Sequence, residues 1–204
     1  MQKGYVWDKI IDWSYEKAIN GLIGIDSAYV LAEKQNPGLS LLQKADAIIR
    51  NQRLLAGSSG FISGLGGFMS LPAAIPANLA TVIFLQLRMV AAIAHIAGMD
   101  IRDQKTKELI ISCLAGNTVK EIIQETGIRT SKALTRKLVN SISTNTLANV
   151  NSKVGFSLLT KSGSKGLINI CKAVPLAGGL IGGTTDVIAT ALIGRTAKRM
   201  FLAS

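Results

Sequence analysis

The sequence has little of the side-chain chemistry on which metal sites and most active sites depend. It contains one histidine, His95, and two cysteines, Cys113 and Cys171, which are far from a CxxC spacing. A single histidine excludes a multi-histidine metal site, and two distant cysteines are too few for a disulfide framework. We therefore expect both cysteines to be free and buried, and we predict neither a metal nor another cofactor.

Nucleotide-binding and hydrolase signatures are also missing. Five glycines fall between Gly57 and Gly67, but neither G-x-x-x-x-G-K-[ST] nor G-x-G-x-x-G nor G-x-S-x-G occurs in the chain. No lysine lies between Gln52 and Gln104, so the glycine run lacks the lysine of a phosphate-binding loop. The glycines therefore call for a different explanation.

Candidate acid–base residues are few. Asp100 and Asp103 flank the end of an apolar segment, and Glu121 and Glu125 are spaced as ordinary solvated helix surface. His95 lies within an apolar helix, where a partly buried histidine with one hydrogen bond is the simpler interpretation. An enzyme is therefore the weakest of the hypotheses that the sequence supports.

Charge is scarce and unevenly distributed. Charged residues make up 17% of the chain and apolar residues 48%, and the mean hydropathy is +0.34. Residues 1–125 hold 12 basic and 11 acidic side chains, whereas residues 126–204 hold 11 basic ones and a single acid, Asp186. A basic half on an apolar chain predicts a polyanionic partner, either lipid headgroups or nucleic acid.

The hydrophobic pattern predicts helices almost throughout and no sheet, because apolar residues recur at helical spacing. We expect an all-α fold, a single domain over 1–204 in which six to eight helices form a compact bundle. Ser40 is a candidate N-cap for the second helix. The expected helices cover residues 4–33, 41–56, 78–98, 103–126, 128–160 and the apolar segment before the C-terminus.

The helix over 78–98 has the length of a membrane span. It contains Gln86, Arg88 and His95, however, and an arginine at the middle of a span costs about 2.5–3.5 kcal/mol. We therefore expect a buried helix of a bundle rather than a span.

Two apolar segments, 54–98 and 173–194, combine glycines at small-xxx-small spacing with prolines. Each glycine inside a helix costs about 1 kcal/mol relative to alanine, and close approach of two helix backbones is the usual compensation. We predict two glycine-rich helical hairpins packed against each other at the centre of the bundle. The glycines expected to make these contacts are Gly60, Gly64, Gly67, Gly178, Gly182 and Gly183.

The two apolar segments resemble the EcsC family of bacterial proteins. The matching pieces are "GSSGFISGLGGFMSLPAAIPANLATVIFLQLRMVAAIAHIAGMD" and "VPLAGGLIGGTTDVIATALIGRTAK". Ala97 departs from the family pattern, which commonly has an aromatic residue there. The positions that carry the resemblance are Gly60, Gly64, Gly67, Pro72, Pro76, Arg88, Gly98, Asp100, Pro175, Gly178, Gly182 and Gly194.

The resemblance implies membranes rather than catalysis. The family is named after a protein encoded beside an ABC transporter, so a membrane-protein partner of that kind is an expectation for this chain. Related glycine-rich helical domains are attached to membrane-acting GTPases. A hydrolase activity has been suggested for the family, but the sequence offers no residues to perform it.

Our first hypothesis for function is binding to an anionic membrane. The basic half would dock first, and the segments 54–98 and 173–194 would partly insert, with pore formation as an extreme outcome. No secretory signal is visible, so we expect a cytoplasmic, peripheral membrane protein. The candidate lipid-binding residues are Lys132, Arg136, Lys137, Lys153, Lys161, Lys165, Lys198 and Arg199.

Two other hypotheses remain open. The alternative is a nucleic-acid-binding helical domain, because residues 118–138 resemble a helix-turn-helix with Gly127 at the turn and Ser131 leading a basic second helix. The third is a lipid-related hydrolase.

Overall fold

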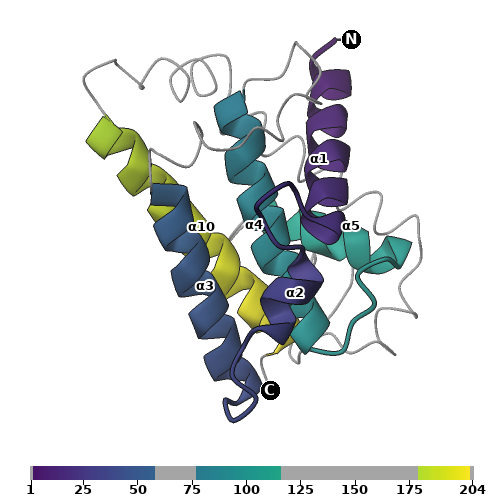
Figure 1. The fold of residues 1–204 in the computed structure, drawn as a ribbon. Coiled ribbons are helices and arrows are strands. Elements are labelled where there is room, and N and C mark those ends of the chain that lie inside the picture. The colour runs from purple at the N-terminus through teal and green to yellow at the C-terminus, as the bar shows by residue number, and fades with distance from the viewer. Residues whose placement is uncertain (1, 58–76, 116–178, 203–204) are drawn as a thin grey trace.

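A computed structural model describes residues 2–57, 77–115 and 179–202 (Figure 1). Within these ranges the chain forms helices and no strand, and a single isolated bridge joins Leu22 and Ile25. The all-α prediction is confirmed. The helices are α1 (Gln2–Asn20), α2 (Ala28–Glu33), α3 (Leu41–Gly57), α4 (Ala77–Ile96), α5 (Gln104–Ser112) with the 3-10 turn η2 (Cys113–Ala115), and α10 (Gly179–Phe201).

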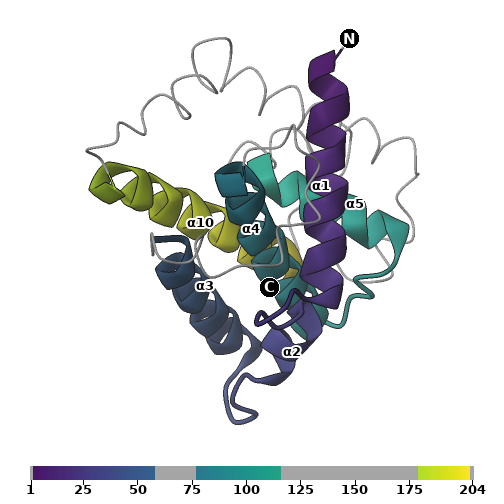
Figure 2. The same cartoon turned by 45° about the horizontal axis from the view of Figure 1, so that its top comes forward.

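Helix α4 forms the centre of the bundle, with α1, α2, α3, α5 and α10 packed around it (Figures 1 and 2). Every residue from 83 to 94 is buried, so the helix has no solvent-facing stripe there. A helix that is apolar on all sides must be surrounded by other helices or by lipid. Here other helices surround it, as predicted for 78–98. None of the described helices combines the length and the apolarity that crossing a membrane requires.

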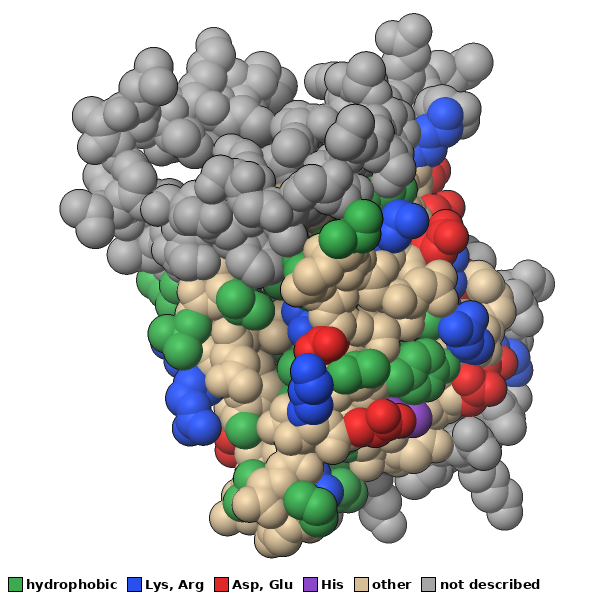
Figure 3. All heavy atoms as spheres, in the orientation of Figure 1, with side chains coloured by type: hydrophobic (Ala, Val, Ile, Leu, Met, Phe, Trp, Pro, Cys, Tyr) green, Lys and Arg blue, Asp and Glu red, His purple; other side chains and the backbone are tan. Residues whose placement is uncertain are grey.

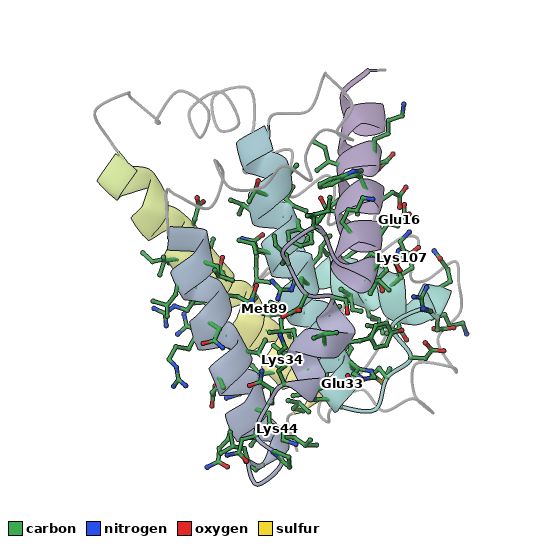
Figure 4. All side chains as sticks on the ribbon, in the orientation of Figure 1. Glu16, Glu33, Lys34, Lys44, Met89 and Lys107 are labelled. Atoms are coloured by element: carbon green, nitrogen blue, oxygen red, sulfur yellow. The ribbon has the colours of Figure 1, made fainter. Side chains whose placement is uncertain are left out.

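Helices α3, α4 and α10 meet at one glycine. A Cβ atom at Gly194 would lie 2.6 Å from Cγ1 of Ile49 and 3.1 Å from Sδ of Met89. Both distances are too short for an unperturbed side chain, so the absence of a Cβ sets how closely α10 approaches its neighbours. Figure 4 labels Met89 at this junction.

Helices from the two glycine-rich segments therefore lie against each other, since α4 belongs to the first segment and α10 to the second. Gly182 and Gly183 lie in the first turns of α10, but their packing is outside what the structure describes. The remaining predicted packing glycines, Gly60, Gly64, Gly67 and Gly178, lie outside the described residues.

The single helix predicted over 4–33 is wrong, because the chain turns between α1 and α2. Gly21 and Gly24 have φ values of 87° and 78°, in the left-handed region that ends a right-handed helix. The N–H of Gly21 still donates to the carbonyl of Lys17 at 2.7 Å, and Leu22 and Ile25 then exchange two backbone hydrogen bonds. After this turn, residues 21–27, α2 packs against α4.

Side-chain caps fix the starts of two helices. Ser40 Oγ accepts from the N–H of Gln43 at 3.3 Å, while Gln43 Oε1 accepts from the N–H of Ser40 at 2.9 Å. This reciprocal capping box confirms Ser40 as the predicted N-cap. Asp103 caps α5 by accepting from the N–H of Thr106 at 2.9 Å. The helix expected over 103–126 is α-helical as far as Ser112, and the part beyond residue 115 lies outside the described residues.

Candidate functional site

Most of the predicted lipid-binding lysines and arginines lie outside the described residues. The exceptions are Lys198 and Arg199, in the last turn of α10. Lys198 Nζ forms an ion pair with Asp46 of α3 at 2.6 Å, whereas Arg199 is exposed. The helix-turn-helix-like segment 118–138 also falls outside the described ranges. The predicted lipid-binding residues outside the described ranges are Lys132, Arg136, Lys137, Lys153, Lys161 and Lys165.

The Asp46–Lys198 ion pair marks the outer edge of the seam between α3 and α10. Arg50 and Arg53 follow Asp46 by one and two helical turns, and Arg195 precedes Lys198 by one turn. Residues three or four apart share a helix face, so all three arginines lie along the same edge of the seam. All three are exposed, and so is Arg199. We call Arg50, Arg53, Arg195 and Arg199 the basic face.

Large hydrophobic side chains accompany the basic face. Leu54 follows Arg53 on α3 and is 70% exposed, and Ile188 on α10 is 66% exposed. Figure 3 shows Lys or Arg and hydrophobic side chains together along the left edge of the molecule, where Figure 1 places α3 and α10. Basic and apolar side chains on one surface are typical of helices that bind at a lipid interface.

Negative charge on this pair of helices is small. Asp46 is the only acidic residue in the sequence of α3, and it is already paired with Lys198. Asp186 is the only acid in α10, where partial burial raises the pKa of its carboxyl group. The basic face therefore carries a net positive charge at neutral pH.

A second unusual feature is a buried charge at the centre of the fold. Arg88, on α4, is 4% exposed, and its Nε and Nη1 atoms have no hydrogen-bond partner in the described part of the chain. Burial lowers the pKa of Arg88 to about 10, and the charge of Asp26 opposes that shift. The guanidinium therefore stays protonated at neutral pH, and an unpaired buried charge costs several kcal/mol.

The described acid whose charge acts on Arg88 has its ion pair elsewhere. Asp26, in the turn before α2, accepts a hydrogen bond from Lys34 Nζ at 2.6 Å. That bond, followed by the charges of Lys34 and Arg88, lowers the pKa of the Asp26 carboxyl group. The carboxylate thus lies within electrostatic reach of Arg88 but forms its ion pair with Lys34 at the surface. Figure 4 shows Lys34 at the end of α2, in front of α4.

Other buried polar groups lie between α3, α4 and α10. Gln86 Nε2 donates to Thr190 Oγ1 over a long 3.5 Å. Gln52 is 1% exposed, and its Oε1 has no hydrogen-bond partner within the described residues. Gln52 is three residues beyond Ile49, and Gln86 three residues before Met89. Because α3 runs antiparallel to α4, these positions form one polar layer next to the Gly194 junction.

The candidate acid–base residues that the structure describes have structural roles, and Glu121 and Glu125 lie outside the described residues. Asp103 caps α5, and Asp100 Oδ1 accepts from the N–H of Arg102 at 2.9 Å. His95 is half-buried and packs edge-on against the Tyr29 ring, with 4.9 Å between centroids. In the described ranges no group of three or more His, Cys, Asp or Glu residues is arranged to hold a metal ion.

The described cysteine is free and buried, as predicted. Burial raises the pKa of the Cys113 thiol, which lies 3.6 Å from the sulfur of Met200. A thiol that stays protonated is a poor nucleophile, so Cys113 acts as a core residue. Cys171 lies outside the described residues.

Comparison with known families identifies the chain. The model of the EcsC protein family matches residues 31–202, from α2 through α10. The chain belongs to the EcsC family. Searches of curated proteins and of solved structures found no match. The resemblance seen in the two glycine-rich segments is thus confirmed, and it extends across most of the EcsC chain.

Two features of this fold were not predicted from the sequence. The predicted lipid-binding residues all lie in the basic half, 126–204, whereas Arg50 and Arg53 lie outside it. Their i, i+3 spacing, followed directly by Leu54, was the available signal. The Asp26–Lys34 pair near Arg88 had no such signal, because a turn that the hydrophobic pattern did not reveal creates it.

Proposed function

We propose that this EcsC protein binds anionic membrane surfaces as a peripheral protein, through the basic face on α3 and α10. The supporting observation is the combination of four exposed arginines with exposed Leu54 and Ile188 on the same two helices. Each Lys or Arg near an anionic leaflet contributes about 1 kcal/mol, so four suffice for weak, reversible attachment. The other basic residues over 126–204 would add to this attraction.

The apolar side chains favour lipid over nucleic acid. A duplex offers phosphates to the arginines but few apolar groups to Leu54 or Ile188, whereas a membrane interface offers both. Nucleic-acid binding is therefore the alternative outcome that the experiment below must separate.

Docking on the surface is better supported than deep insertion of α4. Moving α4 into hydrocarbon would expose Arg88 and Gln86 to lipid, and the arginine alone costs about 2.5–3.5 kcal/mol. The basic face, in contrast, is already exposed and needs no rearrangement to reach a membrane.

The test is sedimentation with vesicles of phosphatidylglycerol and, separately, phosphatidylcholine, over a series of salt concentrations. We expect binding to the anionic vesicles alone, weakening as salt screens the charges. The triple variant Arg50→Gln, Arg53→Gln, Arg195→Gln removes three charges. It should lose about 3 kcal/mol of binding, roughly 100-fold in affinity.

The matched control is Lys9→Gln, Lys17→Gln, Lys105→Gln, which removes three charges from α1 and α5. If both triple variants bind equally weakly, net charge rather than the basic face drives attachment. Failure of the unmodified protein to sediment at low salt, or tighter binding to duplex DNA than to anionic vesicles, would refute the membrane proposal.

A further inference from the structure

Arg88 is the charged group that packing explains least. A helix surrounded by other helices needs only apolar side chains, yet α4 has a guanidinium at its centre with unpaired Nε and Nη1. Removing its positive charge by deprotonation is not an option at neutral pH. Retaining such a group is unfavourable for the fold unless an acceptor occupies its free N–H donors for part of the time.

The helix register places Arg88 on the side of α4 that faces α2. His95 packs against Tyr29 of α2, and Arg88 precedes His95 by seven residues, two helical turns along the same face. Asp26, at the start of this covering segment, acts electrostatically on Arg88. The guanidinium thus lies on the α2 side of α4, within electrostatic reach of Asp26.

The charges around Arg88 favour an anion. Arg88 and Lys34 contribute two positive charges and Asp26 one negative charge, so this cluster has a net charge of +1. Side chains of Lys34 and Asp26 are 63% and 42% exposed, which allows their pair to open without disturbing the core. With that pair open, the positive charges of Arg88 and Lys34 both attract an anion.

We propose that Arg88 is the primary binding residue of a phosphate-group site on the α2 side of α4, with Lys34 as a second ligand and Asp26 as the group that the phosphate displaces. A phosphate fits better than a carboxylate, which has only two oxygens for a guanidinium to engage. A phosphate keeps further oxygens for Lys34 after it has bonded to Arg88. The phosphate comes from a lipid headgroup or from a small phosphate ester.

The direct test observes Arg88 itself by NMR of arginine Nε–H groups in the ¹⁵N-labelled full chain. The Arg88 resonance is assigned by its loss in Arg88→Lys. We expect a saturable shift on titration with inorganic phosphate and with glycerol 3-phosphate, and a much smaller shift with acetate. No saturable shift, or an equal response to acetate, would overturn a phosphate site at Arg88.

The second test is the substitution Arg88→Met, which replaces the buried charge with an apolar side chain of similar length. We expect a higher melting temperature than that of the unmodified protein when phosphate is absent, because an unpaired buried charge has been removed. Phosphate affinity should fall about 30-fold or more. Arg102→Met, at an exposed arginine near Tyr29, should keep that affinity. Unchanged phosphate affinity in Arg88→Met would contradict the assignment.

Asp26→Asn distinguishes a displaced group from a permanent partner. If Asp26 competes with the phosphate, its neutralisation should tighten phosphate binding severalfold and leave the fold intact. If Asp26 is instead the main partner of Arg88, Asp26→Asn should lower the melting temperature strongly without tightening phosphate binding, and the proposal would fail.

Vesicles identify the source of the phosphate. An Arg88 shift with phosphatidylglycerol vesicles at a concentration where glycerol 3-phosphate has no effect assigns the site to a lipid headgroup, and the reverse order assigns it to a soluble ester. The site uses no residue of the basic face. The phosphate site is therefore supported independently of the membrane proposal if the Arg88 shift persists in the Arg50→Gln, Arg53→Gln, Arg195→Gln variant.

Discussion

At the scale of single residues, the core depends on one missing side chain and one retained charge. Gly194 lets α10 approach Ile49 and Met89, and no other residue fits without a shift. Arg88 has the opposite character, a large charged side chain where apolar packing would suffice. Close packing of α10 explains the glycine, and the proposed phosphate site explains the arginine.

Gly194→Ala tests the close approach. The new Cβ gains about 1 kcal/mol in helix propensity, but it lies 2.6 Å from the branched, poorly adaptable Ile49. Overpacking of this kind costs about 1–3 kcal/mol, so we expect a net loss in the free energy of unfolding, measured by urea denaturation.

The control for this prediction is Gly194→Ala combined with Ile49→Ala, which removes the clashing atoms. The double variant should be more stable than the two separate losses added together. Simple additivity would mean that Gly194 and Ile49 are not in tight contact.

At the scale of elements, the turn over 21–27 decides the arrangement of the N-terminal third. It separates α1 from α2, lets α2 pack against α4 and holds Asp26 within electrostatic reach of Arg88. Ser27 then caps α2 by accepting from the N–H of Val30 at 3.2 Å. The turn therefore organises both the fold and the proposed phosphate site.

Gly21→Ala and Gly24→Ala form a matched pair for this turn. Both glycines have left-handed φ values, which cost a substituted residue about 1 kcal/mol or more. At Gly21 the new Cβ would also meet the carbonyl oxygen of Ile25 at 3.0 Å, whereas at Gly24 nothing lies within 4 Å. We expect Gly21→Ala to lower the melting temperature clearly more than Gly24→Ala. Equal effects would show that crowding adds nothing to the backbone cost.

At the scale of the whole molecule, charge and burial are segregated. The described core is built around α4, while α3 and α10 present the basic face to solvent. Two charged residues depart from this pattern: Arg88 is buried on α4, and Asp186 is a half-buried acid on α10 whose ionisation the interior disfavours. Asp186 makes the stability of the whole bundle depend on pH.

The sign of that dependence follows from the raised pKa. The folded state binds the Asp186 proton more tightly than the unfolded state, so this group adds stability as pH falls through its folded pKa and costs stability above it. Asp186→Asn, which mimics the protonated form, should stabilise the protein at pH 7 by a few tenths of a kcal/mol. The advantage should shrink towards pH 4, as measured by thermal unfolding across that range. A constant advantage at all pH values would exclude titration of Asp186 as its cause.

The fold class, the buried character of α4, the Ser40 cap and the family could all be predicted from the sequence. They depend on local information, because helical periodicity, capping residues and short glycine patterns are visible within a short stretch of chain. The structure confirmed the first three, with the boundaries of α3 at Leu41–Gly57 close to those predicted, and the family model confirmed the fourth.

Which distant residues meet depends on how the helices pack. The Asp46–Lys198 pair, the contact of Gly194 with Ile49, and the nearness of Asp26 to Arg88 each join segments separated by dozens of residues. The break at Gly21 was missed because a glycine in an amphipathic pattern is compatible with either a helix or a turn. Packing of α2 onto α4 favours the turn, and the turn holds Asp26 within electrostatic reach of Arg88.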